Sequence, residues 1–245
     1  MKDWKIKLAA VLLVLSAVVY FIHWIIFRDA HHILIYMIGD IGFAFMEVLL
    51  ITILIHQVIE RREKRERMEK MNMVIGAFFS EVGTNLLAFF SDMDPEEDRM
   101  SRELTMSKEW SDEQFEGALN RVKGKDFSID VDRGDIKGLQ RFLVEKRDFL
   151  VRLLENPNLL EHETFTETLW GVFHLMEELS ARGDIDSLPS SDLEHLKGDI
   201  ERAYKRLIGE WVDYMKHLKD NYPYLFSLAL RTNPFDPNAH PVIST

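Results

Sequence analysis

The chain has 245 residues, of which 47% are apolar and 29% charged, with 30 Lys and Arg against 41 Asp and Glu and no cysteine. Residues 1–70 carry ten basic and eight acidic side chains, which leaves 20 basic and 33 acidic side chains for residues 71–245. An acidic region of this kind lacks the basic surface that a nucleic-acid backbone requires, so no nucleic-acid partner is expected. The absence of cysteine excludes disulfides and thiolate metal sites.

The N-terminal segment predicts a membrane-spanning helix. Lys2, Lys5 and Lys7 precede an apolar run over residues 8–27, and a helix of roughly 20 apolar residues crosses a bilayer. The run ends in aromatic residues instead of the small residues of a cleavage site, and a second apolar segment follows at once. We therefore expect an uncleaved helix and not a signal peptide.

A second apolar segment over residues 33–57 predicts another membrane helix. The connection between the two, residues 28–32, is short enough for a tight helical hairpin. Basic residues flank the outer end of each helix, whereas the connection carries one Arg and one Asp. The positive-inside rule then predicts a multi-pass protein of the cell inner membrane with both termini in the cytoplasm and lipid as its partner.

Two acids interrupt the second apolar segment. Asp40 and Glu47 are seven residues apart, so they lie on nearly one face of the helix. Counting back from the connection brings Tyr20 level with Asp40, whereas Glu47 has only Ser16 near its level. A carboxylate costs about 2.5–3.5 kcal/mol near the bilayer centre. We expect a homo-oligomer. In it, these acids are either neutral, hydrogen-bonded contacts between subunits or rings of carboxylates that select cations along a water-filled path. A proton path is a further alternative.

Residues 58–92 predict a helical extension. A collar of basic residues begins it and suits an anionic membrane surface; its members are Arg61, Arg62, Lys64, Arg65 and Arg67. Beyond the collar, apolar residues recur at helical spacing from Met71 to Phe89, which indicates a buried face. Gly76 and Gly83 lie on one face and permit another helix to approach closely.

Residues 93–231 predict an acidic helical domain, so the fold class is all-α: a transmembrane hairpin over residues 1–57 followed by an antiparallel helical bundle. Ser111 and Gln114 form a capping box that opens a helix reaching about Val122. Residues 126–132 alternate like a lone strand and are either an extended loop or a strand that pairs between subunits. Further helices are expected from Asp135, over residues 163–181 and up to about residue 221, with residues 232–245 as a tail.

Several acids and histidines share helix faces, as a carboxylate-bridged metal centre in a bundle requires. The weak metal candidates are His174, Glu177, Asp192 and His195; Glu178 beside His174, and the pair Asp213 and His217, have the same kind of spacing. The sequence contains no Glu-x-x-His, which is the usual di-iron pattern. We therefore expect solvated or ion-paired residues and no cofactor.

The sequence contains no glycine-rich phosphate loop, nucleophile elbow, His-Glu-x-x-His helix or kinase signature. No catalytic residue is therefore assigned, and the chain is not expected to be an enzyme, with a metal-dependent helical-bundle enzyme as the remaining alternative.

Several phrases of the sequence resemble an uncharacterised prokaryotic family of two-transmembrane-helix proteins with a helical cytoplasmic domain. The phrases are residues 71–84, Arg147-Asp148-Phe149-Leu150, Glu155-Asn156-Pro157, residues 169–175, and Tyr222-Pro223-Tyr224 with Arg231-Thr232-Asn233. The resemblance covers most of the chain and implies this layout, but it implies no activity and no functional residue.

These features predict a homo-oligomeric membrane protein in which the second transmembrane helix lines a cation-permeable pore. The alternative is a membrane-tethered scaffold without transport or catalysis, in which the bundle and the segment Tyr222 to Phe226 recruit a protein partner.

Overall fold

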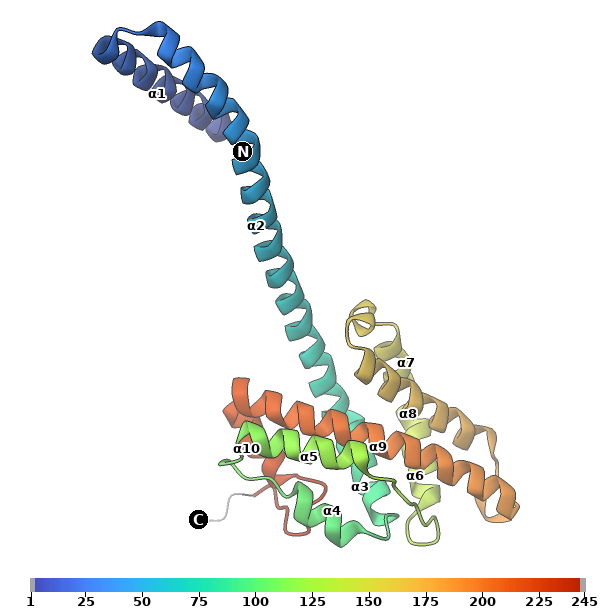
Figure 1. Ribbon diagram of the computed structural model, residues 1–245. Helices are drawn as coiled ribbons and strands as arrows, with labels where there is room; N and C mark the ends of the chain where they lie inside the picture. The colour runs from blue at the N-terminus through green and yellow to red at the C-terminus, as the bar shows by residue number, and fades with distance from the viewer. Residues whose placement is uncertain (1–2, 243–245) are drawn as a thin grey trace. The chain divides into compact units, whose positions relative to one another are not determined.

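The computed structural model describes residues 3–242, and every regular element in that range is a helix (Figure 1). The predicted all-α class is confirmed, since no strand occurs between residues 3 and 242. The described chain divides into two compact units, one ending at Lys64 and the other beginning at Arg65.

The first unit contains α1 (Asp3–Phe27) and the first part of α2 (Ala30–Phe78). The turn between them is only Arg28 and Asp29, shorter than the expected connection. Arg28 has a φ of 49°, and its N–H donates to the carbonyl of Trp24 at 2.9 Å. The Asp29 carboxylate accepts a hydrogen bond from the backbone N–H of His31 at 2.9 Å and so caps the start of α2.

The helix that begins at Ala30 continues far beyond Gln57, into the segment for which the sequence predicts a helical extension. A π-helical turn, η1 (Phe79–Gly83), follows α2 directly and leads into α3 (Thr84–Asp92). The remaining helices of the second unit are α4 (Glu97–Leu104), α5 (Asp112–Gly124), α6 (Ile136–Glu145), α7 (Arg147–Leu154), η2 (Pro157–Glu161), α8 (Glu163–Ala181), η3 (Ile185–Ser187), α9 (Ser190–Asn221) and α10 (Pro223–Arg231).

The long helix α9 is the centre of the second unit and contacts α3, α5, α8 and α10 (Figure 1). Its buried apolar residues recur every three or four positions, as an amphipathic helix requires; they include Leu196, Ile200, Ala203, Leu207, Trp211, Met215 and Leu218. The apolar face predicted between Met71 and Phe89 also enters this core, through Phe78, Val82 and Leu86.

Local sequence signals predicted several helix ends correctly. The Ser111 hydroxyl accepts from the backbone N–H of Gln114, whose side chain accepts from the N–H of Ser111 at 2.7 Å, so the predicted capping box is present. The helix expected over residues 163–181 has those bounds as α8. Proline at position 223 opens α10, where its missing N–H removes no helical hydrogen bond.

The segment that alternates like a strand is an extended loop. Ile129 is buried, and its N–H donates to a carboxylate oxygen of Glu201 on α9 at 3.0 Å. The N–H of Asp130 donates to the carbonyl of Met93 at 2.8 Å. The alternation therefore reflects side chains that pack alternately into the helical core and toward solvent, and not a ladder of paired strands.

The segment expected to be a tail begins with packed residues. Asn233 is buried and its amide donates to the carbonyl of Leu104 at 2.9 Å, and the ring of Phe235 lies 5.1 Å from that of Trp211. The absence of helical periodicity in this segment correctly excluded a helix, but it could not reveal these non-local contacts.

Candidate functional site

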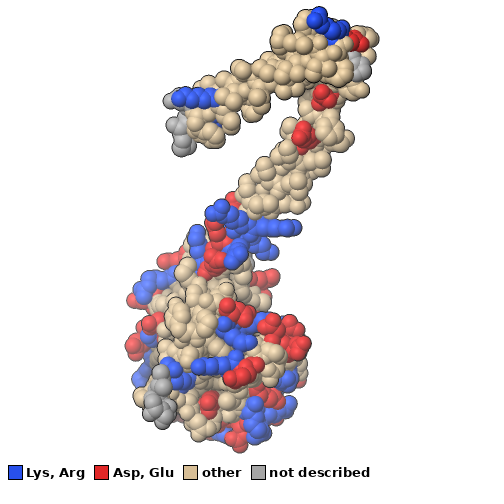
Figure 2. All heavy atoms as spheres, turned by 90° about the vertical axis from the view of Figure 1, so that its left-hand side faces the viewer, with Lys and Arg blue, Asp and Glu red and all other residues tan. Residues whose placement is uncertain are grey.

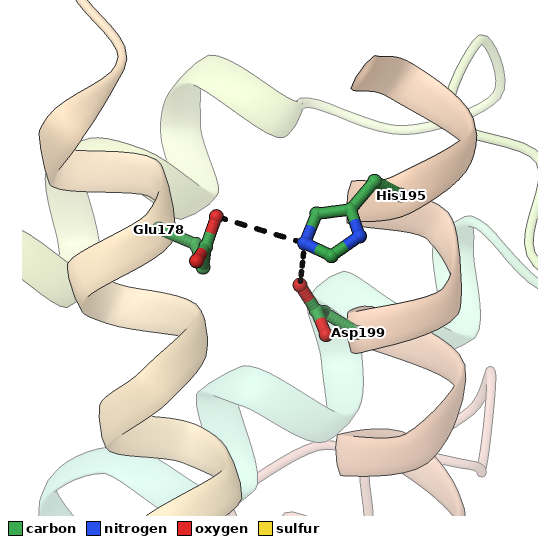
Figure 3. A group of neighbouring side chains, drawn as sticks. All are labelled: Glu178, His195 and Asp199. Carbon is green, nitrogen blue, oxygen red and sulfur yellow. Dashed lines mark ion pairs between the residues drawn. The ribbon is translucent and has the colours of Figure 1, made fainter. Parts of the chain in front are cut away.

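Four side chains form an acid–histidine cluster between α8 and α9. His174 and Glu178 lie four residues apart on α8, and His195 and Asp199 lie four apart on α9, so each pair projects from one face of its helix. The short connection through η3 brings these two faces together. Figure 3 shows the imidazole of His195 with one nitrogen directed at the carboxylates of both Glu178 and Asp199.

The donor atoms of the cluster alternate between nitrogen and oxygen. The Nε2 atom of His195 lies 3.4 Å from Oδ2 of Asp199 and 3.8 Å from Oε2 of Glu178. The Nε2 atom of His174 lies 3.7 Å from Oδ1 of Asp199 and 3.9 Å from Oε1 of Glu178. Each imidazole therefore faces both carboxylates.

Asp199 is the buried member of the cluster. Its side chain is 1% exposed, whereas those of His174 and His195 are 54% and 53% exposed. Arg202 donates to Oδ1 of Asp199, but Oδ2 has no hydrogen-bond donor among the described residues. The cluster thus combines one buried acceptor with two imidazoles that solvent reaches.

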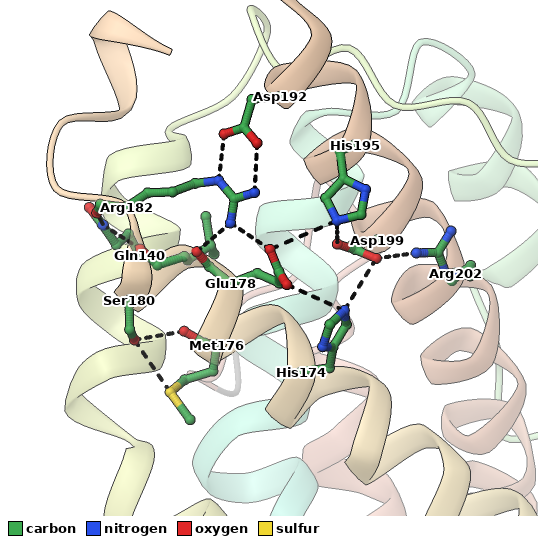
Figure 4. A network of polar contacts seen from close by, with 11 residues as sticks. Gln140, His174, Met176, Glu178, Ser180, Arg182, Asp192, His195, Asp199 and Arg202 are labelled. Atoms are coloured by element: carbon green, nitrogen blue, oxygen red, sulfur yellow. Dashed lines mark hydrogen bonds and ion pairs between the residues drawn. The ribbon is translucent and has the colours of Figure 1, made fainter. Parts of the chain in front are cut away.

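Arg182 fixes the position of Glu178 from outside the cluster (Figure 4). Its guanidinium donates to both oxygens of Asp192, at 2.6 and 2.8 Å, and to Oε2 of Glu178 at 2.6 Å. These hydrogen bonds, opposed by burial, lower the pKa of Glu178 and of Asp192 and raise that of Arg182. Gln140 of α6 donates to the backbone carbonyl of Arg182 at 2.8 Å, which holds the end of α8. Glu178 is therefore an ionised, positioned carboxylate at neutral pH.

The structure groups only part of the predicted metal set. His174 and His195 lie in the cluster, but Glu177 is exposed on another face of α8, and Asp192 is bound to Arg182 instead. Spacing alone favoured Asp192 because it precedes His195 by three residues; Asp199, which follows His195 by four, carries the same signal and was missed. The pair Asp213 and His217 forms no ion pair among the described residues.

A second feature of the helical domain is an apolar groove of about 530 Å³. Its lining comes from α2, η1, α3, α9 and α10 and is mainly apolar: Asn72, Met73, Gly76, Ala77, Phe79, Ser80, Thr84, Tyr214, His217, Leu218, Tyr222, Leu225, Leu228, Ala229 and Thr232. Tyr222 and Leu225 belong to the segment that the sequence identified as a candidate for partner recruitment.

Close packing shapes one wall of this groove. The rings of Phe79 and Tyr214 stack at 5.0 Å with an angle of 12° between their planes. A methyl group added to Gly76 would lie 3.5 Å from the Tyr214 hydroxyl oxygen, which is an ordinary van der Waals contact, so the helix approach predicted from Gly76 does not depend on glycine at this position. Phe79 also belongs to η1, and π-helical turns occur frequently at functional sites.

The polar part of the groove centres on His217. Its Nδ1 atom lies 3.2 Å from the amide nitrogen of Asn72 and 3.2 Å from that of Asn221. Burial lowers the pKa of His217, partly offset by Asp220, so the imidazole is neutral at pH 7. A neutral imidazole that accepts from an amide is suited to hydrogen bonding with a polar group and not to binding an anion by charge.

In the first unit, Asp40 and Glu47 are exposed on α2, and no hydrogen bond joins Tyr20 to Asp40 or Ser16 to Glu47 within the described hairpin. All four side chains are exposed within one chain, and their role as intramembrane or pore residues stays a prediction. The collar residues are exposed as well: Arg61, Arg62, Lys64, Arg65 and Arg67. Figure 2 shows an almost uncharged surface over the apolar helices and mixed charges over the helical domain.

Comparison with known proteins identifies relatives over both parts of the chain. Residues 1–59 match a family model described as the MJ1433 N-terminal helical domain, and residues 67–231 match the C-terminal helical domain of the same family. The uncharacterised protein MJ1433 of Methanocaldococcus jannaschii is 46% identical over 235 residues, which cover 96% of this chain and 94% of that protein. No solved structure matches the chain. The chain therefore belongs to the MJ1433 family, whose members combine an N-terminal and a C-terminal helical domain.

Proposed function

We propose that this protein is a membrane-anchored binding protein. Its two apolar N-terminal helices cross the bilayer, and its helical domain binds an amphiphilic small molecule in the groove beside η1. This proposal starts from the alternative function predicted from the sequence, a membrane-tethered scaffold. It assigns the binding surface to the groove.

The observation that carries the anchor is the exposure of both apolar helices. The segments Trp4–Phe27 and Ile33–Asp92 contain 18-residue windows with mean hydropathies of 2.5 and 2.2, and no residue in either window is buried. The first segment has 24 residues, or about 36 Å of helix, which exceeds the hydrocarbon thickness of about 30 Å. Apolar surface of this extent requires lipid or a partner to cover it.

The charges around these helices support a defined orientation. Lysines precede α1, and the basic collar follows the apolar part of α2, so both termini lie in the cytoplasm by the positive-inside rule. The bilayer is then the one that bounds the cytoplasm, which the sequence predicts to be the cell inner membrane. The collar also interacts favourably with anionic lipid headgroups.

The groove supports a ligand with a long apolar part and one hydrogen-bonding end. A volume of about 530 Å³ lies within the range of small-molecule sites, about 300–1,000 Å³. The wall of Phe79, Tyr214 and Leu225 is apolar, while Asn72 and neutral His217 provide hydrogen-bonding groups. A single-chain amphiphile such as a protonated fatty acid or a fatty alcohol has this chemistry. A membrane-anchored domain encounters such molecules.

Two experiments test the proposal. Membranes from expressing cells are washed with alkaline carbonate; an integral anchor keeps the chain in the membrane fraction, and release into the wash would contradict it. Ligand binding is measured with the full chain in nanodiscs by displacement of a fluorescent long-chain alcohol. Gly76→Leu fills the groove and abolishes binding, whereas Gly209→Leu, a matched change at a helical position with open space around it, preserves binding. Equal binding by both variants would refute the groove assignment.

A cation path is the second candidate function, because Asp40 and Glu47 are exposed carboxylates on an apolar helix. In lipid they require neighbouring copies of α2 or a water-filled path, so this candidate includes a homo-oligomer. Flux of monovalent cations into liposomes measures it. The expected result is flux that Asp40→Asn and Glu47→Gln reduce; absent or unchanged flux excludes the cation path and leaves the binding protein.

A further inference from the structure

We propose that His195, Glu178 and Asp199 form a binding site for a divalent metal ion of the zinc class. The site lies in the helical domain between α8 and α9 and is separate from the groove and from the apolar helices. His174 lies on the same opening and is close enough to approach the ion as a further donor.

The spacing of the donor atoms fits a small tetrahedral ion. One ligand atom from each of His195, Glu178 and Asp199 lies within 4.8 Å of the other two. Zinc bonds of about 2.0–2.2 Å to nitrogen and oxygen place tetrahedral ligands about 3.3–3.6 Å apart. The His195–Asp199 distance of 3.4 Å already has this value, and the His195–Glu178 distance of 3.8 Å requires only a small closure.

The unsatisfied oxygen of Asp199 is an independent sign that the cluster accepts a ligand. The side chain is 1% exposed, and its Oδ2 atom has no hydrogen-bond donor among the described residues although it points toward His195 (Figure 3). Nε2 of His195, 3.4 Å away, forms an ion pair with this oxygen only when the imidazole is protonated; beside a neutral imidazole, a buried acceptor without a hydrogen bond costs about 1–3 kcal/mol. A metal ion at the centre of the cluster would provide the missing partner.

Arginine side chains position both carboxylates without blocking the site (Figure 4). Arg202 donates to Oδ1 of Asp199 and leaves Oδ2 without a hydrogen bond. Arg182 donates to Oε2 of Glu178, the oxygen that lies 3.8 Å from His195, and a carboxylate oxygen has a second lone pair with which it can bind an ion. Oε1 of Glu178 lies toward His174. Outer partners of this kind hold metal-binding carboxylates in place. Asp192 in turn fixes Arg182, so the Glu178 carboxylate is already held in position before an ion binds.

The donor set indicates which ion binds. Imidazole nitrogen combined with carboxylate oxygen, in a three-ligand set with room for a fourth, is typical of zinc, whereas magnesium and calcium prefer oxygen ligands alone. The half-exposed imidazoles provide a path for the ion from solvent. The ion would also bridge α8 to α9 and stabilise the central helix pair by binding only the folded state.

The test uses the full chain purified in detergent and stripped of metal with a chelator. Zinc is added and binding is measured by calorimetry, and cobalt is used in parallel because four-coordinate Co²⁺ has intense visible absorption bands. One ion per chain is expected, with affinity reduced about 10-fold or more by His195→Gln and by Glu178→Gln. Glu177→Gln is the matched control, since it makes the same change one residue away on an exposed face.

A stripped protein that binds neither metal overturns the proposal. Binding that His195→Gln leaves unchanged also overturns it, because the ion would then lie elsewhere. His195 is half-exposed, so its replacement leaves the core intact, and circular dichroism of the variant verifies that the helices are retained.

Discussion

Glu210 makes the stability of the helical domain dependent on pH. This carboxyl is 6% exposed on α9 and forms no ion pair among the described residues. Burial raises its pKa to about 7 from an ordinary value of 4.5; a hydrogen bond from Thr164 opposes the increase and Asp213 adds to it. Between these two values the folded domain binds a proton that the unfolded chain has released.

The size of the effect follows from the two pKa values. The difference is about 2.5 pH units, and each unit corresponds to 1.36 kcal/mol, so Glu210 destabilises the ionised folded state by about 3 kcal/mol. Because the folded pKa is the higher one, stability is greatest below the unfolded pKa and is lost as the pH rises from about 4.5 through 7. Glu210→Gln removes the ionisation, and we expect the variant to be more stable than the wild type by up to about 3 kcal/mol above pH 7 and by less than about 1 kcal/mol at pH 5.

The assay is urea unfolding of the full chain in a mild detergent, followed by circular dichroism from about pH 5 to about pH 8, so that the transition reports on the helical domain. Glu194→Gln on the same helix is the control, because that side chain is 75% exposed. If the wild type and Glu210→Gln lose stability equally with rising pH, Glu210 is not the titrating group and the reasoning fails.

Two further substitutions test the local structure. Gly83→Ala places a methyl group 2.5 Å from the ring of Phe79 and 2.9 Å from that of Phe78. We expect urea unfolding to show that the free energy of unfolding falls by about 1–3 kcal/mol, because the added methyl group overpacks the core. An unchanged unfolding midpoint would mean that η1 relaxes freely. Ser111→Ala removes the cap that accepts from Gln114 and is expected to cost about 1 kcal/mol, whereas Ser111→Asp, which retains an acceptor, is expected to cost less than half of that.

Local chemistry explains why the helix ends were predictable. A capping box or a helix-opening proline acts on neighbouring residues, so the first turn of α5 and of α10 could be placed from the sequence alone. Apolar periodicity likewise identified the buried face of the second unit, because it depends only on spacing along one helix. Asp94 and Pro95 have the sequence of an N-cap followed by a first helical proline, but the Asp94 carboxylate accepts from the N–H of Glu96 in a turn, and α4 begins at Glu97.

Features that depend on distant residues could not be predicted. Residues 126–132 alternate in polarity, but only the position of α9 decides that Ile129 enters a helical core and binds Glu201. The ring of Phe79, in the π-helical turn, stacks on that of Tyr214, 135 positions away in the chain, which the local sequence cannot reveal. The cluster of His195 with Glu178 depends on how the connection through η3 aligns α8 with α9.

The two buried acids of α9 differ in how the fold compensates for their burial, and this difference determines what each can do. Glu210 has no cationic partner among the described residues, and burial raises its pKa to about 7, so at neutral pH it carries less than a full negative charge and attracts a cation only weakly. Asp199 has Arg202 as its counter-charge, and the guanidinium satisfies only one of its two oxygens. The second oxygen faces an imidazole from its own helix and a carboxylate positioned by Arg182. We therefore assign the proposed ion-binding role to Asp199 and not to Glu210, although both are acidic residues of the same helix.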